Sequence, residues 1–251
     1  MFNLIFGKRM QQSRKEHQDY AASLAMARIQ GKEQTDRRDF MDFILSSRGE
    51  SHQLTDEELV HNAGLFMGAG PKTTATVLLC VTHCLLKTPH AYRRVTDEVR
   101  AASTLRNVHF SFNPVSFVTG NKRRSPILIA GHSIPPATCV GVYQLSAYHS
   151  PLNFHDPQAF RPERWLPEVY NDPSSPFHSD RRDVHKPFPL GPRDCIGRNL
   201  AFHEMRLYLA LVLWNFDLSL EESMEQWHVQ KSFGFWQKPA LRVNVKQQTR
   251  I

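Results

Sequence analysis

The sequence predicts a mainly α-helical protein with small β hairpins. Apolar or small residues recur with a helical period over residues 59–85, which is typical of one long helix. A second helical period follows Cys195. Between these segments, the stretch PILIAGHSIPPATCVGVY is typical of two short strands about a turn at Gly131–His132.

The composition is ordinary for a globular protein. Of the 251 residues, 41% are hydrophobic and 22% are charged, so a core of useful size is expected. The length of the chain suits one large domain or two small ones, and we expect one domain over residues 1–251. Four cysteines at irregular spacing do not form a disulfide framework, which favours a reducing compartment.

The formal net charge of +7 is compatible with several kinds of binding partner. Basic clusters can serve a nucleic acid, an anionic membrane or an acidic protein, or they can be scattered solvated charge. No aromatic–basic interleaving of the kind that binds single strands is found, so no nucleic-acid partner is predicted. No apolar run reaches the roughly 18–20 residues of a membrane span, so no anchor is predicted either.

The first half of the chain is expected to be helical. Residues 1–54 are typical of charged helices with a loop. A helix is then predicted over residues 55–88, because Thr55 and Glu58 form a capping box and Pro89 follows the last apolar position. Another helix is predicted over residues 90–106.

The second half has shorter elements. Residues 108–125 show neither helical period nor alternation. A β hairpin is predicted over residues 127–143, followed by proline-rich loops that contain FRPERW. A loop and a following helix are predicted over residues 188–216, and the tail ALRVNVK has the pattern of a strand.

Cys195 lies at the junction between a Gly/Pro/Arg loop and the last helical period. A cysteine binds metals as its thiolate, which a helix N-terminus favours. Gly191 and Gly197 let the backbone approach a bulky flat group, and Arg193 offers donors for a carboxylate. Phe188 can cover the sulfur. This combination suggests thiolate ligation of a haem.

The segment FPLGPRDCIG resembles the haem-binding signature of the cytochrome P450 family. It matches the signature at Phe188, Gly191, Arg193, Cys195 and Gly197. The following NLAFHEMRLYLALVLWNFDL is similar to fungal microsomal members. The resemblance implies haem (iron protoporphyrin IX) as the cofactor, with Cys195 as the axial ligand of the iron.

Further segments carry the resemblance over residues from about 36 to 246, the C-terminal part of the cytochrome P450 fold. MGAGPKTTAT is similar to the family's oxygen-binding segment. There, Ala69 and Gly70 would make room for dioxygen, and the Thr73 hydroxyl would hold the water that delivers protons. FRPERW resembles a family stretch in which Arg164 joins a structural ion-pair network.

The sequence also departs from the family's pattern. Lys72 stands where the family usually has an acid, and Pro71 precedes it inside the long helix. No glutamate is followed by arginine three residues later, so the family's Glu-x-x-Arg helix is missing. It would lie between about 108 and 125. Because that helix supplies the ion-pair partners of Arg164, we expect this arginine to lack its charge complement.

The resemblance implies a monooxygenase that inserts one oxygen atom from O₂ into a small organic substrate, lipophilic or a secondary metabolite. NADPH-cytochrome reductase would supply electrons and dock on basic residues, with candidates Arg181, Arg182, Arg193 and Arg198. Fungal members are usually anchored in the endoplasmic reticulum, but without a predicted anchor the localisation of this chain is left unassigned. The alternative is a truncated or mis-spliced remnant that holds no haem.

Other motifs do not indicate a further catalytic or binding site. GLFMGAGPKTT lacks the spacing of a phosphate-binding loop, because Pro71 separates Gly70 from Lys72. Cys80 and Cys84 lie one helical turn apart, with His83 beside them, and this spacing on an apolar helix is more typical of core packing than of a metal site. No nucleophile elbow supports Ser/His/Asp catalysis.

Overall fold

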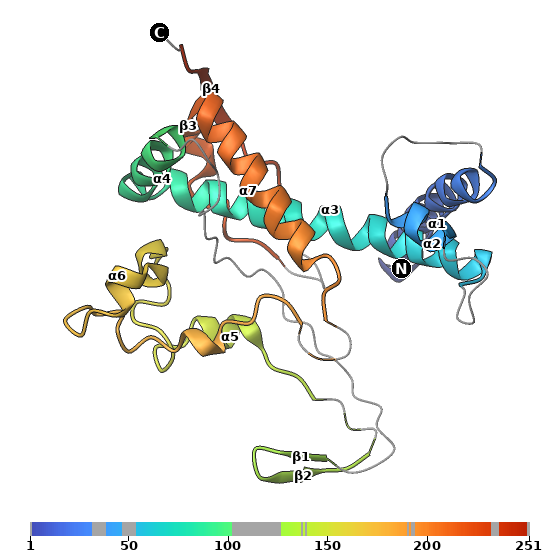
Figure 1. The fold of residues 1–251 in the computed structure, drawn as a ribbon, viewed down its shortest axis with the longest axis horizontal. Helices are drawn as coiled ribbons and strands as arrows, with labels where there is room; N and C mark the ends of the chain where they lie inside the picture. Colours follow the sequence, from blue (N-terminus) through green and yellow to red (C-terminus); the bar gives the residue numbers. More distant parts are fainter. Residues whose placement is uncertain are drawn as a thin grey trace. The chain divides into compact units, whose positions relative to one another are not determined.

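The computed structural model describes residues 2–31, 39–46, 54–101, 127–136, 138, 140–189, 191, 194–231 and 236–249. These residues are mainly helical, as predicted, and contain two antiparallel pairs of strands (Figure 1). The chain divides into two units, residues 1–73 and 74–251, with the division inside one long helix.

The first unit contains α1 (Phe2–Ile29), α2 (Phe40–Ser46) and the beginning of α3 (Asp56–Leu86). Ala21 and Ala25 of α1 and Leu59 of α3 are buried. A Cβ atom placed on Gly64 would lie 3.9 Å from the Cβ of Ala21. Small residues therefore let α1 and α3 approach closely, as glycine and alanine do at helix contacts.

An ion-pair network joins α1 to α2. The Arg28 guanidinium lies 3.1 Å from a carboxylate oxygen of Asp39 and 2.6 Å from one of Asp42. The Asp42 amide donates to Asp39 Oδ1, and the Asp39 amide donates to Asp42 Oδ2, so the carboxylates also hold the first turn of α2. Helices in residues 1–54 were predicted, and α1 and α2 confirm them.

The start of α3 confirms the predicted capping box. The Glu58 amide donates to the Thr55 hydroxyl at 3.2 Å, and the Thr55 amide donates to the Glu58 carboxylate at 2.8 Å. At the other end, α3 stops at Leu86, two residues before the predicted boundary. Pro89 is the first residue of α4 (Pro89–Ala101). Proline suits this position because the N–H group that it lacks would have no partner within the first turn of the helix.

By length and composition alone, α3 is a helix that could cross a membrane. The sequence predicted no such segment, because polar residues interrupt its apolar run. Core helices of soluble proteins pass the same criterion, so the observation is weak evidence for a membrane span. The predicted lack of an anchor is therefore not confirmed.

The second unit is built around α7 (Arg198–Asn215), which packs against α4 and the end of α3 (Figure 1). Two neighbouring clusters form its core, and they consist of Val81, Leu85, Ala91 and Leu209, and of Val99, Ala210 and Leu213. Every large side chain of these clusters is aliphatic, so the hydrophobic effect holds the three helices together.

Helix α7 is apolar on two faces. One face buries Met205, Leu209, Ala210 and Leu213. The other face exposes large apolar side chains, namely Leu200 (47% exposed), Leu207 (43%), Tyr208 (58%) and Leu211 (50%). Large apolar side chains on two opposite faces of one helix are typical of a position between two layers of a protein.

Arg100 fixes the C-terminal end of α7. Its guanidinium donates to the carbonyl oxygens of Leu213 (3.1 Å) and Phe216 (3.2 Å) and pairs with Asp217 at 2.8 Å. A cation at this position satisfies carbonyl groups that have no partner within the helix.

Two short antiparallel sheets complete the second unit. β1 (Ile127–Ile129) pairs with β2 (His132–Ile134) about Ala130 and Gly131, whose φ angles are +47° and +82°. Such a two-residue turn requires positive φ at both positions. The turn lies one residue before the predicted one, and the strands end well short of residue 143.

β3 (Phe216–Leu220) pairs with β4 (Val243–Gln247), with Phe216 opposite Gln247. β4 confirms the predicted strand in the tail. β3 follows directly on α7, which ends at Asn215, one residue before the predicted boundary of the helix.

Short helical turns lie in the connections between these elements. Between β2 and α7 they are α5 (Gln144–Tyr148), η1 (Pro162–Trp165), α6 (Pro167–Tyr170) and η2 (Arg182–Val184). Between β3 and β4 lies η3 (Glu222–Met224).

Acid should destabilise the second unit through His185. Its ring lies 5.1 Å from the Tyr148 ring and 4.8 Å from the Trp165 ring, and burial lowers its pKa to about 4. Between pH values near 6.5 and 4, the unfolded chain binds a proton that the folded chain does not bind. The free energy of unfolding should therefore fall across this window, by up to about 3 kcal/mol.

Urea unfolding measured at several pH values tests this expectation. His185→Phe should flatten the decrease, whereas His90→Gln, at an exposed position of α4, should leave it unchanged. An identical decrease in the protein and in His185→Phe would contradict the assignment to His185.

Candidate functional site

The loop before α7 positions Cys195. Gly191 has a φ of +97°, a conformation that favours glycine. The Asp194 amide then donates to the Gly191 carbonyl at 3.0 Å, and the Arg198 amide donates to the Cys195 carbonyl at 3.1 Å. Cys195 therefore lies immediately before the first turn of α7, as the sequence predicted.

An open hollow of about 850 Å³ lies beside the sulfur. Cys195 is half-buried in its wall, and the other lining residues are Asp194, Ile196, Arg198, Asn199, Phe202, His203 and Arg206. Two arginines against one aspartate give this wall an excess of positive charge. The volume lies within the range of small-molecule and cofactor sites.

Gly197 lies next to the Cys195 sulfur. A Cβ atom at this position would lie 4.0 Å from the Cys195 Sγ, which is van der Waals contact. That Gly197 lets the backbone approach a flat group stays a prediction.

Phe188 contacts the wall of the hollow. Its ring lies 5.1 Å from the Phe202 ring, and the Arg198 guanidinium lies 5.8 Å from its centre. That Phe188 covers the sulfur stays a prediction. Arg193, the predicted carboxylate partner, lies outside the described residues.

The predicted oxygen-site residues lie in the first unit, on α3. The Thr73 hydroxyl is 2.8 Å from the Ala69 carbonyl oxygen and 3.1 Å from the Gly70 carbonyl oxygen, and donates its hydrogen to them. A Cβ atom on Gly70 would meet no atom within 4 Å, so this position is open. The geometry of this cluster and that of Cys195 are defined within separate units.

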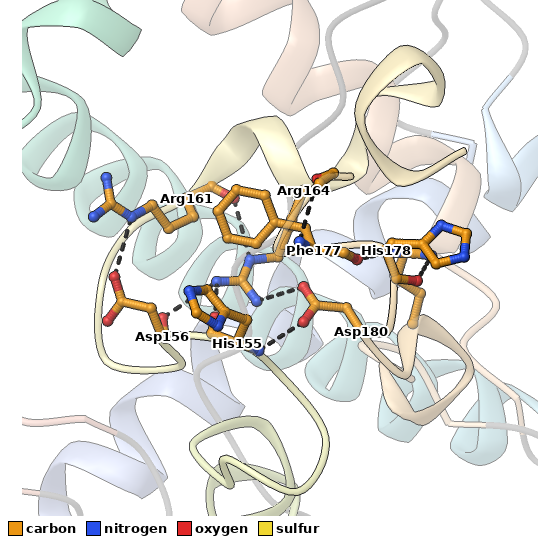
Figure 2. A network of polar contacts seen from close by, with 9 residues as sticks. His155, Asp156, Arg161, Arg164, Phe177, His178 and Asp180 are labelled. Carbon is orange, nitrogen blue, oxygen red and sulfur yellow. Dashed lines mark hydrogen bonds and ion pairs between the residues drawn. The ribbon is translucent and has the colours of Figure 1, made fainter. Parts of the chain in front are cut away.

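The structure corrects the expectation that Arg164 lacks a charge partner. Its guanidinium pairs with Asp180 at 2.8 Å, and the two side chains are only 8% and 1% exposed (Figure 2). Burial lowers the pKa of Arg164, while the Asp180 carboxylate raises it. The positive charge is therefore paired within the second unit. Residues 108–125, where the Glu-x-x-Arg helix was expected to be missing, lie outside the described residues.

Backbone groups complete this network (Figure 2). Arg164 also donates to the carbonyl oxygens of His155 (2.8 Å), Asp156 (3.2 Å) and Arg161 (3.2 Å). The His155 amide in turn donates to the second carboxylate oxygen of Asp180 at 2.6 Å. The Phe177 ring lies 5.1 Å from the guanidinium. Arg164 and Asp180 together therefore hold residues 154–180 as one folded loop.

Sequence reasoning did not identify Asp180. The stretch HSDRRD offers another aspartate three residues later, and neither has a spacing that marks an ion-pair partner. Only the fold, which brings residue 180 against residue 164, separates the two acids.

The structure gives no support to a metal site at Cys80 and Cys84. Among the residues that are described, no group of three or more His, Cys, Asp and Glu side chains comes close enough to hold a metal ion. Burial raises the pKa of Cys80 to about 12 and that of Cys84 to about 11, which disfavours the thiolates that metals bind.

Chemically, the Cys195 site offers one soft sulfur donor at a helix start, with space and positive charge beside it. A single thiolate suits a metal that a flat macrocycle already coordinates, because the protein then needs to supply only an axial ligand. The donor and the glycines beside it therefore fit a haem.

Comparisons with known proteins agree with this interpretation. A family model described as Cytochrome P450 matches residues 1–112 and 112–243. Cytochrome P450 monooxygenase dtxS2 of Metarhizium robertsii is 42% identical over 97% of this chain and 51% of its own length. Cytochrome P450 monooxygenase olcB of Penicillium canescens is 41% identical over 92% of this chain and 52% of its own length. Trichothecene C-4 hydroxylase of Trichoderma arundinaceum is 41% identical over 92% of this chain and 50% of its own length.

The chain spans about half the length of these relatives. The alignment with dtxS2 extends over 267 positions, which exceeds the 251 residues of the chain. That relative therefore has residues within the aligned region that have no counterpart here.

Removal of one partner of the buried ion pair should be costly. Asp180→Ala leaves Arg164 charged and unpaired, so the free energy of unfolding should fall by about 3–5 kcal/mol. Asp183→Ala is a matched control, because the Asp183 side chain is 71% exposed and lies 3.6 Å from Arg181. This control should change the stability by less than about 1 kcal/mol.

Chemical denaturation of both variants provides the measurement. The double variant Arg164→Met/Asp180→Ala should lose less stability than Asp180→Ala alone, because it buries no unpaired charge. Equal losses in Asp180→Ala and Asp183→Ala would show that the pair does not hold the loop.

Proposed function

This chain belongs to the cytochrome P450 family, and on that premise we propose that it binds haem through Cys195 and forms the haem-binding part of a monooxygenase. Haem is the cofactor of this family. The observation that carries the proposal is the position of Cys195, a half-buried sulfur immediately before α7, beside a hollow lined by Arg198 and Arg206. A thiolate donor at a helix start and a cationic wall suit an anionic macrocycle.

In this proposal the loop before α7 holds the cofactor. Cys195 would bind the haem iron through its sulfur, and Gly191 and Gly197 would leave room for the ring. Phe188 would shield the sulfur from water, and Arg193 would bind a carboxylate of the haem. When bound, the haem supplies the activation of O₂ by two electrons, which thiolate ligation promotes.

Three residues of α3 would take part in the binding of O₂ and in proton delivery. Ala69 and Gly70 offer little side-chain bulk, so a small molecule can approach the helix backbone. The Thr73 hydroxyl directs its hydrogen towards the Ala69 carbonyl, so its lone pairs can accept a hydrogen bond from a water molecule. Thr73 would thus position a water that can pass on a proton.

The substrate is proposed to be a small organic molecule, lipophilic or a secondary metabolite. The relatives include one whose name specifies hydroxylation of a trichothecene. The corresponding reaction for this chain is insertion of one oxygen atom from O₂, while the other oxygen atom leaves as water after uptake of two electrons and two protons.

NADPH-cytochrome reductase is the proposed electron donor, and Arg198 is the best-placed docking residue. Arg198 is exposed and lines the hollow beside Cys195. Arg181 is also exposed. Arg182 donates to the Phe177 carbonyl at 2.8 Å and lies 4.6 Å from the Tyr170 ring, so it primarily stabilises its own loop.

Haem titration of the purified protein tests the ligand. The protein should bind one equivalent of haem, and Cys195→Ser should weaken binding by at least about tenfold because the thiolate is lost. Cys84→Ser is a matched control that should bind haem as the unaltered protein does. No binding by the unaltered protein, or equal binding by Cys195→Ser, would contradict the proposal, and the former result would favour a non-catalytic remnant.

Charge reversal tests the electron-donor surface. Arg198→Glu should weaken the affinity of the haem-loaded protein for a reductase, and more so at low than at high ionic strength, because salt screens exposed charges. Arg93→Glu, at an exposed position of α4, should have little effect at either salt concentration. A loss that is independent of salt would argue against electrostatic docking at Arg198.

A further inference from the structure

A second pocket lies within residues 74–251, with a volume of about 720 Å³. It shares no lining residue with the hollow beside Cys195. Its walls come from the end of α3, from α5, from the segment around η1, and from Trp227, His228, Gln230 and Trp236. The volume suits a small molecule, and nothing in the proposed haem chemistry uses this pocket.

Two aromatic clusters face this pocket from distant parts of the sequence. In the first, the His185 ring lies 5.1 Å from Tyr148 and 4.8 Å from Trp165. In the second, the His83 ring lies 5.4 Å from Trp227 and 5.6 Å from His228. Aromatic walls attract flat rings by stacking and by the burial of apolar surface.

Two thiols and one imidazole of the wall, those of Cys80, Cys84 and His185, are neutral at physiological pH. Burial raises the pKa of Cys80 to about 12 and that of Cys84 to about 11. Burial also lowers the pKa of His185 to about 4. These side chains therefore add no charge that would disfavour an apolar ring system.

The two permanent charges of the described wall are positive, and each of them is paired with a carboxylate. Lys87 and Arg164 line the pocket, whereas its described lining includes no aspartate or glutamate. The carboxylates that pair with these cations, Glu225 and Asp180, lie outside that lining. The Lys87 ammonium pairs with one carboxylate oxygen and has further N–H groups with which it can bind an anion.

We propose that this pocket binds a flat aromatic anion, such as a carboxylate or sulfonate on a fused ring system. The two aromatic clusters would contact the faces of the ring, and Lys87 would bind the anionic group. The site is independent of haem ligation by Cys195.

The tryptophans make binding directly visible. Three of the four tryptophans of the chain, Trp165, Trp227 and Trp236, line the pocket, and only Trp214 does not. We would titrate the full chain with 1-anilinonaphthalene-8-sulfonate, an aromatic anion that accepts energy from tryptophan. The expected result is one saturable equivalent that quenches most of the tryptophan emission, with the same quenching in Trp214→Phe.

Charge recognition requires a matched pair of variants and probes. Lys87→Gln should weaken binding of the sulfonate by about tenfold, because a charge-assisted hydrogen bond is lost. It should leave binding of the uncharged N-phenyl-1-naphthylamine unchanged. Arg94→Gln removes one charge from the same unit outside the pocket and should affect neither probe.

Binding of several equivalents without saturation, or quenching that disappears in Trp214→Phe, would overturn the proposal and indicate adventitious association with apolar surface. Equal affinities of Lys87→Gln and Arg94→Gln for the sulfonate would overturn the anion preference. The titration is repeated in Cys195→Ser, where haem ligation is lost and this pocket is intact. Failure of the haem proposal is thereby separated from failure of this one.

Discussion

The packing of α7 against α4 is the contact on which the second unit depends. Aliphatic side chains hold the buried face of α7, and Arg100 binds the carbonyl groups at its C-terminal end. Because Cys195 lies immediately before the N-terminal end of the same helix, this packing also determines where the sulfur lies. The candidate haem ligand is thus positioned by the hydrophobic core, and the loop before it supplies only the turn and the open space.

A buried charge requires a partner, and the protein meets this requirement at Arg164 with Asp180. The family resemblance led us to expect that loss of the Glu-x-x-Arg helix would leave this arginine unpaired. The pair with Asp180, together with three backbone carbonyls, satisfies it instead. The loop that carries η1 can therefore fold around local contacts. The apolar face of α7 that is exposed is not covered by any of the described residues. The relatives of this chain are about twice as long.

Local signals in the sequence predicted the fold well. The capping box at Thr55 and Glu58, the helical period of α3 and the position of Cys195 each depend on residues a few positions apart. What the sequence could not predict depends on distant contacts. Asp180 resembles Asp183 until the fold brings one of them to Arg164, and β3 is defined by its pairing with β4. Likewise, the aromatic pocket joins His83 to residues beyond position 220, which no spacing indicates.

In the function proposed above, the Cys195 thiolate would bind the haem iron. The most direct test of this ligation is the absorption spectrum of the haem-loaded protein after reduction and addition of carbon monoxide. We expect the red-shifted band of a thiolate-ligated haem, and we expect Cys195→Ser to lack this band. A spectrum typical of histidine or neutral thiol ligation, or a red-shifted band that persists in Cys195→Ser, would contradict this ligation.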